Sequence, residues 1–246
     1  MAPSSSVLTF VHGTLAGTDA PAVADNCLVR NDWVCGEYLR SRAPQITDAL
    51  VQHIWITVVS VLLGLLVAFP LALLARRYRR LEGFVVGATT AIYTIPSLAL
   101  FALLLPFTGL TATTVILGLA LYSLTILVRN VIEGLKGVPE DVRESALGMG
   151  YGRRRMLLAV EVPLALPTII AGVRVAAVST VALTTVGAIV GYGGLGNLLL
   201  EAVDSRFKAQ VLTAAVLCVA LAVAFDLVLV GVQRVLTPWA RTRRAG

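Results

Sequence analysis

The chain has 246 residues, of which 57% are apolar and only 14% are charged, and its mean hydropathy is +0.86. Soluble domains contain about 45–50% apolar and roughly 25% charged residues. The composition therefore excludes a soluble domain, a disordered chain and a disulfide-rich scaffold, and it predicts an all-α, polytopic membrane protein. The net charge of +6 fits either nucleic-acid binding or the basic cytoplasmic edge of a membrane protein, and the positions of the charges decide between them.

Residues 1–48 form a polar N-terminal arm. It has no basic segment followed by an apolar core, so no cleavable signal peptide is predicted. We expect the first membrane span to carry the arm to the outer side. Cys27 and Cys35 lie in it, and an oxidising compartment would allow a disulfide between them. The alternative is two free thiols, and the residues alone do not decide between these states.

Three spans are predicted next, at about 54–75, 84–105 and 110–128. The first lies in a window of 27 residues without charge, and a spanning helix needs about 20 apolar residues. The other two share a charge-free window of 46 residues. As one helix that window would measure about 69 Å, far more than the roughly 30 Å hydrocarbon core. We place the turn between these two spans at Pro106–Gly109.

A polar loop, 129–161, is followed by spans at about 164–190 and 210–233 and by a basic tail, 236–246. The transmembrane domain thus covers 49–235 and contains five spans. Fourteen of the 20 Lys and Arg residues flank the spans on the side of this loop and tail, and five lie on the other side. Cytoplasmic loops collect Lys and Arg, so the N-terminus is expected outside and the C-terminus inside. No basic face is left for nucleic acid.

Motifs for cofactor or metal chemistry are weak. Gly191, Gly193 and Gly196 match the dinucleotide fingerprint G-x-G-x-x-G, but that fingerprint works between a strand and a helix, whereas here it follows a predicted span. We interpret it as a tight turn at the outer mouth. No phosphate-binding G-x-x-x-x-G-K-[ST] occurs, and His12 and His53 have no neighbouring ligand cluster. Neither enzymatic activity nor a metal site is expected.

The loop 129–161 predicts a short amphipathic helix. Pro139, followed by two acidic residues, is typical of a helix start, and Gly148 and Gly150 are typical of its end. Taken alone, this pattern describes a solvated surface helix.

The spacing of residues in this loop resembles the EAA motif of binding-protein-dependent ABC importer permeases, EAA-x3-G-x9-I-x-LP. The departures from that motif are small or aliphatic exchanges. The matching residues are Glu144, Ser145, Ala146, Gly150, Val160, Val162 and Pro163. Further segments, spread over about residues 50–235, resemble the permeases of osmoprotectant importers. They are Ile95–Leu100, Arg129–Asn130, Gly134–Val138, Leu164–Pro167, Ala171–Arg174 and Gly193–Gly196.

This resemblance implies the type I ABC importer permease fold in a prokaryotic cell membrane. A second permease subunit, identical or paralogous, would complete the pathway for glycine betaine, choline, carnitine or proline. Two ATPase subunits would bind ATP and Mg, leaving this chain without a cofactor, and an outer substrate-binding protein would deliver the solute. The helix at Glu144–Gly150 would couple to the ATPase through Val142, Ala146 and Met149. Import of another small zwitterion or an amino acid, and a non-transporting membrane scaffold, remain alternatives.

Two charges, Arg174 and Asp226, lie inside predicted spans at depths of roughly 15 and 10 Å. A charge at such depth is costly unless it is paired or faces water. Two readings remain open: the residues pair, within or between subunits, or each reaches water separately.

Pro96 is expected to kink the second span and to free a backbone carbonyl. An importer would place such polar backbone near its pathway, although a kink that serves only packing is an alternative. The candidate pathway or gating residues are Pro96, Ser97, Thr184, Gly193, Gly194 and Gly196.

Overall fold

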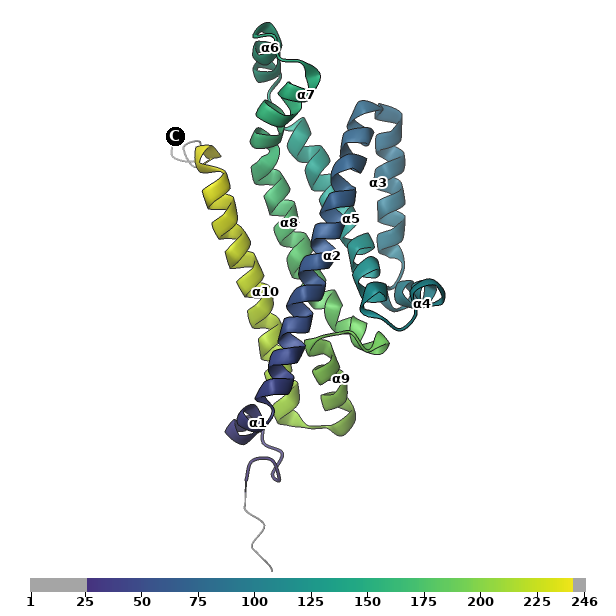
Figure 1. Cartoon of the computed structure of the whole chain (residues 1–246), viewed down its shortest axis with the longest axis vertical. Coiled ribbons are helices and arrows are strands. Elements are labelled where there is room, and N and C mark those ends of the chain that lie inside the picture. The colour runs from purple at the N-terminus through teal and green to yellow at the C-terminus, as the bar shows by residue number, and fades with distance from the viewer. Residues whose placement is uncertain (1–25, 241–246) are drawn as a thin grey trace, which may run out of the picture.

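The structure is a computed structural model that describes residues 26–240 of the chain. The described part is built from helices, and its long helices lie side by side in a bundle (Figure 1). The α-helices are α1 (Gly36–Ser41), α2 (Ala43–Arg77), α3 (Arg79–Thr94), α4 (Ser97–Thr108), α5 (Ala112–Lys136), α6 (Glu140–Gly148), α7 (Arg153–Met156), α8 (Val162–Thr184), α9 (Leu195–Ser205) and α10 (Lys208–Leu236).

Shorter helical segments continue two of these helices. A π-helical segment, Leu157–Glu161, joins α7 to α8, and a 3-10 segment, Thr185–Val190, extends α8. A 3-10 turn, Pro238–Ala240, follows α10.

Four helical stretches of the described chain are long and apolar enough to cross a membrane. They are α2, α5, the run Arg153–Val190 that contains α8, and α10, and they coincide with four of the five predicted spans. The helices exceed the predicted spans because helical geometry continues into polar sequence: α2 begins at Ala43 and α5 ends at Lys136. The first eight residues of the predicted loop 129–161 are therefore helical.

The second predicted span, 84–105, is not one helix. α3 and α4 together are apolar enough for a span, but they are bent by 98° at Ile95 and Pro96. Proline lacks a backbone N–H and disfavours helical geometry in the residue before it, and Ile95 is accordingly extended, with φ −67° and ψ 128°. The predicted turn at Pro106–Gly109 also differs, because α4 continues through Pro106 and ends at Thr108.

The core of the bundle lies around α5, which packs between α2 and α8. Glycines allow close approach: a Cβ on Gly64 of α2 would meet Ser123 of α5, and one on Gly172 of α8 would meet Asn130 of α5. Small residues at such contacts are typical of helix packing in membranes. α10 instead leaves many apolar side chains exposed, among them Val216, Val219, Val223, Leu227 and Val228.

The bundle has two ends. The α6 end carries α6, α7, the end of α2 and the start of α3, and the α9 end carries α1, α9 and the start of α10 (Figure 1). Of the predicted arm, residues 26–42 precede α2 and residues 43–48 belong to it, while residues 1–25 lie outside the described part. Residues 241–246 of the predicted tail also lie outside it.

Candidate coupling and gating sites

The residues of the EAA-like motif lie on α6 and on the helical run that follows it. Glu144 and Ser145 are exposed on α6, and Ala146 is buried. Gly150 has φ +79° and ends the helix, with its N–H donating to the carbonyl of Leu147. This is the left-handed geometry that glycine adopts without steric cost at a helix C-terminus. Farther on, Val160 lies in the π-helical segment and Pro163 in the first turn of α8.

The apolar face of α6 differs from the predicted one. Ala146 is 1% exposed and packs inside the chain itself, and Val142 is only half-buried. The large apolar side chains that α6 and its end expose are those of Leu147 and Met149. In this structure α6 is turned so that Ala146 faces its own chain, and the contact of Ala146 with an ATPase groove stays a prediction.

A buried carboxylate holds the α6 end together. Glu161, at the end of the π-helical segment, is only 2% exposed. Its two oxygens accept hydrogen bonds of 2.6 and 2.5 Å from the guanidinium of Arg76 at the end of α2. The Nε of Arg143 on α6 lies 3.1 Å from Glu161 Oε1, and Arg143 also donates to the carbonyl of Leu135 on α5. One carboxylate thus links α2, α6 and the start of the α8 run.

The two intramembrane charges are paired in the structure. Arg174 of α8 donates from Nε to Asp226 Oδ1 at 2.9 Å and from Nη2 to Oδ2 at 3.0 Å. The pair joins α8 to α10 within one chain. Charged side chains inside membrane spans are commonly paired in this way, and a bidentate pair is stronger than a single hydrogen bond.

The break between α3 and α4 leaves the carbonyl of Ile95 without a helical partner. The hydroxyl of Tyr122 on α5 donates to it, and the Tyr122 ring contacts the ring of Tyr93 edge to face. Pro96 is exposed and Ser97 begins α4. At the bend the freed carbonyl is therefore satisfied by Tyr122 of α5 and lies beside two aromatic rings.

The glycine-rich turn at 191–196 packs against the backbone of two helical segments. A Cβ on Gly193 would lie 2.4 Å from the nitrogen of Ala188, and one on Gly196 would lie 2.3 Å from the carbonyl oxygen of Thr185. Gly194, with φ +56°, lies so close to His53 of α2 that a Cβ would be 2.6 Å from the His53 Cβ. Only glycine fits these three positions, and Gly191 has φ +83°, so close packing at 193 and 196 and backbone geometry at 191 account for the pattern that resembles a dinucleotide fingerprint.

Neutral side chains of α2 hold this turn in place. Gln52 accepts a hydrogen bond of 3.0 Å from the N–H of Gly194. The buried ring of His53 accepts from the N–H of Leu195 at 3.3 Å and donates through Nε2 to the carbonyl of Val181 on α8 at 3.0 Å. Thr184, fully buried at the end of α8, lies 3.4 Å from the hydroxyl of Thr57 on α2.

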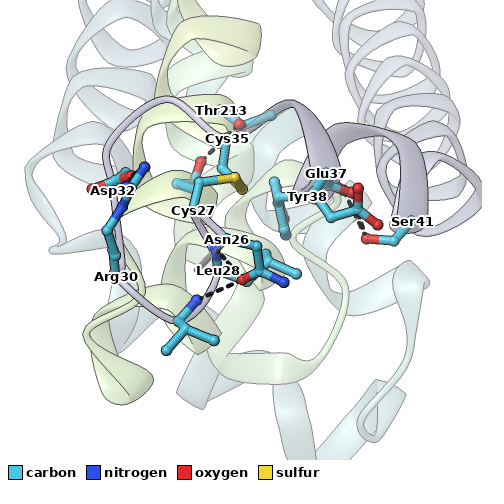
Figure 2. The surroundings of a disulfide bond; sticks show 12 residues. Asn26, Cys27, Leu28, Arg30, Asp32, Cys35, Glu37, Tyr38, Ser41 and Thr213 are labelled. Atoms are coloured by element: carbon cyan, nitrogen blue, oxygen red, sulfur yellow. Dashed lines mark hydrogen bonds and ion pairs between the residues drawn. A yellow bond between two sulfur atoms is a disulfide. The ribbon is translucent and has the colours of Figure 1, made fainter. Parts of the chain in front are cut away.

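The cysteines of the arm are joined in the structure. Cys27 and Cys35 form a disulfide that closes a loop in front of α1, and Figure 2 shows it beside Tyr38. The Tyr38 ring meets the ring of Phe207 edge to face at the start of α10. Burial raises the pKa of Tyr38, and the nearby carboxylate of Glu201 raises it further, so this phenol stays neutral.

Comparison with known proteins decides the family. Residues 60–242 match the model of the binding-protein-dependent transport system inner membrane component family. The chain belongs to this family. It is therefore a multi-pass protein of the cell membrane. No group of three or more potential metal ligands occurs in the part of the chain that the structure describes.

Curated relatives match most of the chain. The chain is 38% identical over 204 residues to the glycine betaine/carnitine/choline transport system permease protein OpuCD of Bacillus subtilis, covering 82% of this chain and 89% of the relative. It is 34% identical over 206 residues to the osmoprotectant import permease protein OsmW of Salmonella typhimurium, covering 82% and 96%.

Solved structures share the fold. The chain is similar to an inward-facing structure of the MetNI methionine ABC transporter, with a TM-score of 0.71, 22% identity, and coverage of 78% of this chain and 96% of that chain. It is also similar to an amino acid ABC transporter crystallised with histidines, with a TM-score of 0.66, 17% identity, and coverage of 80% and 96%. At these identities the similarity shows the ABC importer permease fold alone.

The candidate residues do not form one site. Thr184 lies near the glycine-rich turn, Pro96 and Ser97 lie at the α3–α4 bend, and the coupling residues lie at the α6 end. Three structural groups escaped the sequence analysis: Gln52 with His53, Tyr122, and Glu161 with its two arginines. Most of their partners are far away in sequence. The only local signal was Glu161 next to Val-Pro at the start of a predicted span, because a carboxylate that becomes buried there requires a counter-charge.

Proposed function

We propose that this chain is the translocation-pathway subunit of an ATP-driven importer for a compatible solute such as glycine betaine, choline, carnitine or proline. The observation that carries this proposal is the 38% identity, over 82% of the chain, to a permease named for glycine betaine, carnitine and choline. The relative OsmW, named for osmoprotectant import, supports the same substrate class.

In this proposal the α6 end faces the cytoplasm and the N-terminus lies outside. The support is the position of the cations, since Arg76, Arg77 and the arginines of 153–155 all lie at that end. Two ATPase subunits, which bind ATP and Mg, dock there. A second copy of this chain or a paralogue completes the pathway, and a substrate-binding protein delivers solute to the α9 end.

The α6 helix is proposed as the coupling helix. Its exposed Leu147 and Met149 supply an apolar contact for a groove on the ATPase. Movement of α6 reaches the bundle through Arg143 and Glu161, which tie it to α2 and α8. At the opposite end, the turn held by Gln52 and His53 is proposed as the outer gate, where Thr184 and the glycines set the closed position.

The test of this function is reconstitution of the chain with its ATPase and substrate-binding protein in proteoliposomes. We expect ATP-dependent uptake of radiolabelled glycine betaine or choline, and stimulation of ATPase activity by the loaded binding protein. If only an amino acid is taken up, the substrate class is amino acids and not osmoprotectants. Absence of any uptake together with unstimulated ATPase activity would favour a non-transporting scaffold.

Coupling is tested at two neighbouring glycines. Gly150 and Gly152 both leave open space for a Cβ, but only Gly150 has a positive φ, and Gly152 lies outside α6. Gly150→Leu should therefore distort the end of α6 and reduce uptake at least about ten-fold while ATP hydrolysis persists, because about 1–2 kcal/mol of backbone strain displaces the coupling segment. The matched control, Gly152→Leu, should retain uptake within about two-fold. Equal uptake by both variants would argue against the role of Gly150.

A further inference from the structure

We infer that the loop closed by the Cys27–Cys35 disulfide is a docking surface for the substrate-binding protein of this importer. This inference rests on the proposed function, because it needs the α9 end to face outward. The loop precedes residues 60–242, which match the family model, so family membership alone does not assign it a role. Its position, its rigidity, its exposed side chains and its connections to the proposed gate all bear on the inference.

The loop lies at the outer end of the bundle, beside the start of α10. On α2, exposed Trp55 and the arginine Arg76 are separated by 21 residues. At 1.5 Å per residue this is about 32 Å, which matches a hydrocarbon core of about 30 Å with a Trp at one interface and an Arg at the other. The twelve residues of α2 from Ala43 to Ile54 then extend about 18 Å beyond the hydrocarbon. The disulfide loop packs back against Arg206 and Lys208, just before the predicted span at 210–233, so it lies at the outer membrane surface.

The loop is held in one conformation. Besides the disulfide, the side chain of Asn26 accepts hydrogen bonds from the N–H groups of Leu28 and Val29 (Figure 2). Asn31 bonds across to the α9–α10 turn, where it donates to the carbonyl of Arg206 at 3.0 Å and accepts from the N–H of Lys208 at 2.9 Å. A fixed loop presents a binding surface without the entropy cost of ordering it.

Three large apolar side chains on this fixed loop are exposed. Val29, Trp33 and Val34 are 63%, 55% and 78% exposed. All three lie within six positions of one loop, which makes them available to a partner at this end of the bundle. A rigid Trp beside aliphatic residues is also the residue type that contributes most to protein interfaces.

The substrate-binding protein is the occupant that the connections of this loop favour. Asn31 holds the α9–α10 turn, and α9 begins directly after the glycine-rich turn proposed as the gate. On the other side, α1 leads into α2, which carries Gln52 and His53, the residues that hold the same turn. A protein seated on the loop would thus contact the two elements that position the gate, as delivery of solute to that gate requires.

The test is a photoreactive benzoylphenylalanine introduced at Val34 in the complete importer, reconstituted with the substrate-binding protein that supports uptake. We expect a light-dependent adduct with the binding protein, mapped by mass spectrometry. Adducts only with lipid, with residues 1–25 of this chain, or with a second permease subunit would each overturn the inference. If the carried solute is not an osmoprotectant but the adduct forms, the proposed substrate class fails and the docking surface stands.

A kinetic test uses the double variant Trp33→Ser/Val34→Ser. It should raise the concentration of loaded binding protein needed for half-maximal uptake about five-fold or more, while the maximal rate stays within about two-fold. The matched control is Val235→Ser, at the end of α10 that lies at the α6 end, because Val235 is 77% exposed, close to the 78% of Val34. An unchanged concentration dependence in the double variant, or an equal shift in the control, would contradict docking at this loop.

Discussion

The two ends of the bundle are held together by different chemistry. At the α6 end, one buried carboxylate, Glu161, binds two guanidinium groups from α2 and α6. At the α9 end, glycines that touch backbone are held by the neutral side chains of Gln52 and His53. The long arginine side chains can rotate while they keep their contact with Glu161. Glycines that touch the backbone of a neighbouring helix can move very little before atoms clash. We therefore expect the α6 end to transmit movement and the α9 end to adopt discrete positions.

The largest effect is expected at the carboxylate. Glu161→Ala removes the carboxylate that joins Arg76 and Arg143, whose side chains are 28% and 17% exposed, so we expect a loss toward the lower end of the about 3–5 kcal/mol that breaking a buried ion pair costs. The melting temperature of the purified protein, followed by circular dichroism in detergent, should fall sharply. Glu144→Ala, at an exposed position of α6, should leave it within a degree or two of the wild type. If both variants melt alike, the network does not hold the α6 end.

A smaller effect is expected at the glycine-rich turn. Gly194→Ala adds a Cβ that would lie 2.6 Å from His53, whereas Gly191→Ala adds one into open space, and both positions have positive φ. Gly191 has left-handed helical geometry, with ψ 2°, whereas Gly194 has ψ −119°, so Gly194→Ala adds both a contact with α2 and a larger backbone strain. We expect Gly194→Ala to cost about 1–3 kcal/mol more in thermal or denaturant unfolding. Equal losses would show that His53 does not restrain the turn.

The smallest effect is expected at Arg174 and Asp226. The single variants Arg174→Gln and Asp226→Asn each leave an unpaired charge, while the double variant leaves none. A double-mutant cycle on thermal stability should therefore give a favourable coupling of roughly 1 kcal/mol between the two residues. Strictly additive losses would show that each charge reaches water by itself and that the pair contributes no coupling energy to stability.

The sequence predicts the apolar spans well because membrane insertion depends on local hydropathy. It also locates α6, since a proline, two acids and a terminal glycine act over short distances. The 98° bend between α3 and α4 exceeds the predicted kink, because its geometry also depends on Tyr122, 27 residues from the carbonyl that it binds. A proline signals the break, but only packing sets the angle.

The candidate sites were only partly predictable for the same reason. Arg174 and Asp226 stood out because charges are rare in spans. Their pairing was one of two hypotheses, and separate contact of each charge with water was the other. Glu161 lies 85 residues from Arg76, and Leu195 lies 142 residues from His53, and no local pattern links residues so far apart. The glycine pattern was read as a turn, but its contacts with α2 and with the 3-10 segment follow from tertiary structure alone.

The central claim is that the α6 end faces the cytoplasm and the α9 end faces outward. Labelling of single cysteines in intact cells with a membrane-impermeant maleimide tests it directly. In a Cys218→Ser background, whose remaining cysteines are joined in the disulfide, Asp204→Cys on exposed α9 should be labelled in intact cells. Ser145→Cys on α6 should be labelled only after the membrane is opened. Labelling of Ser145→Cys in intact cells, with Asp204→Cys protected, would contradict the account.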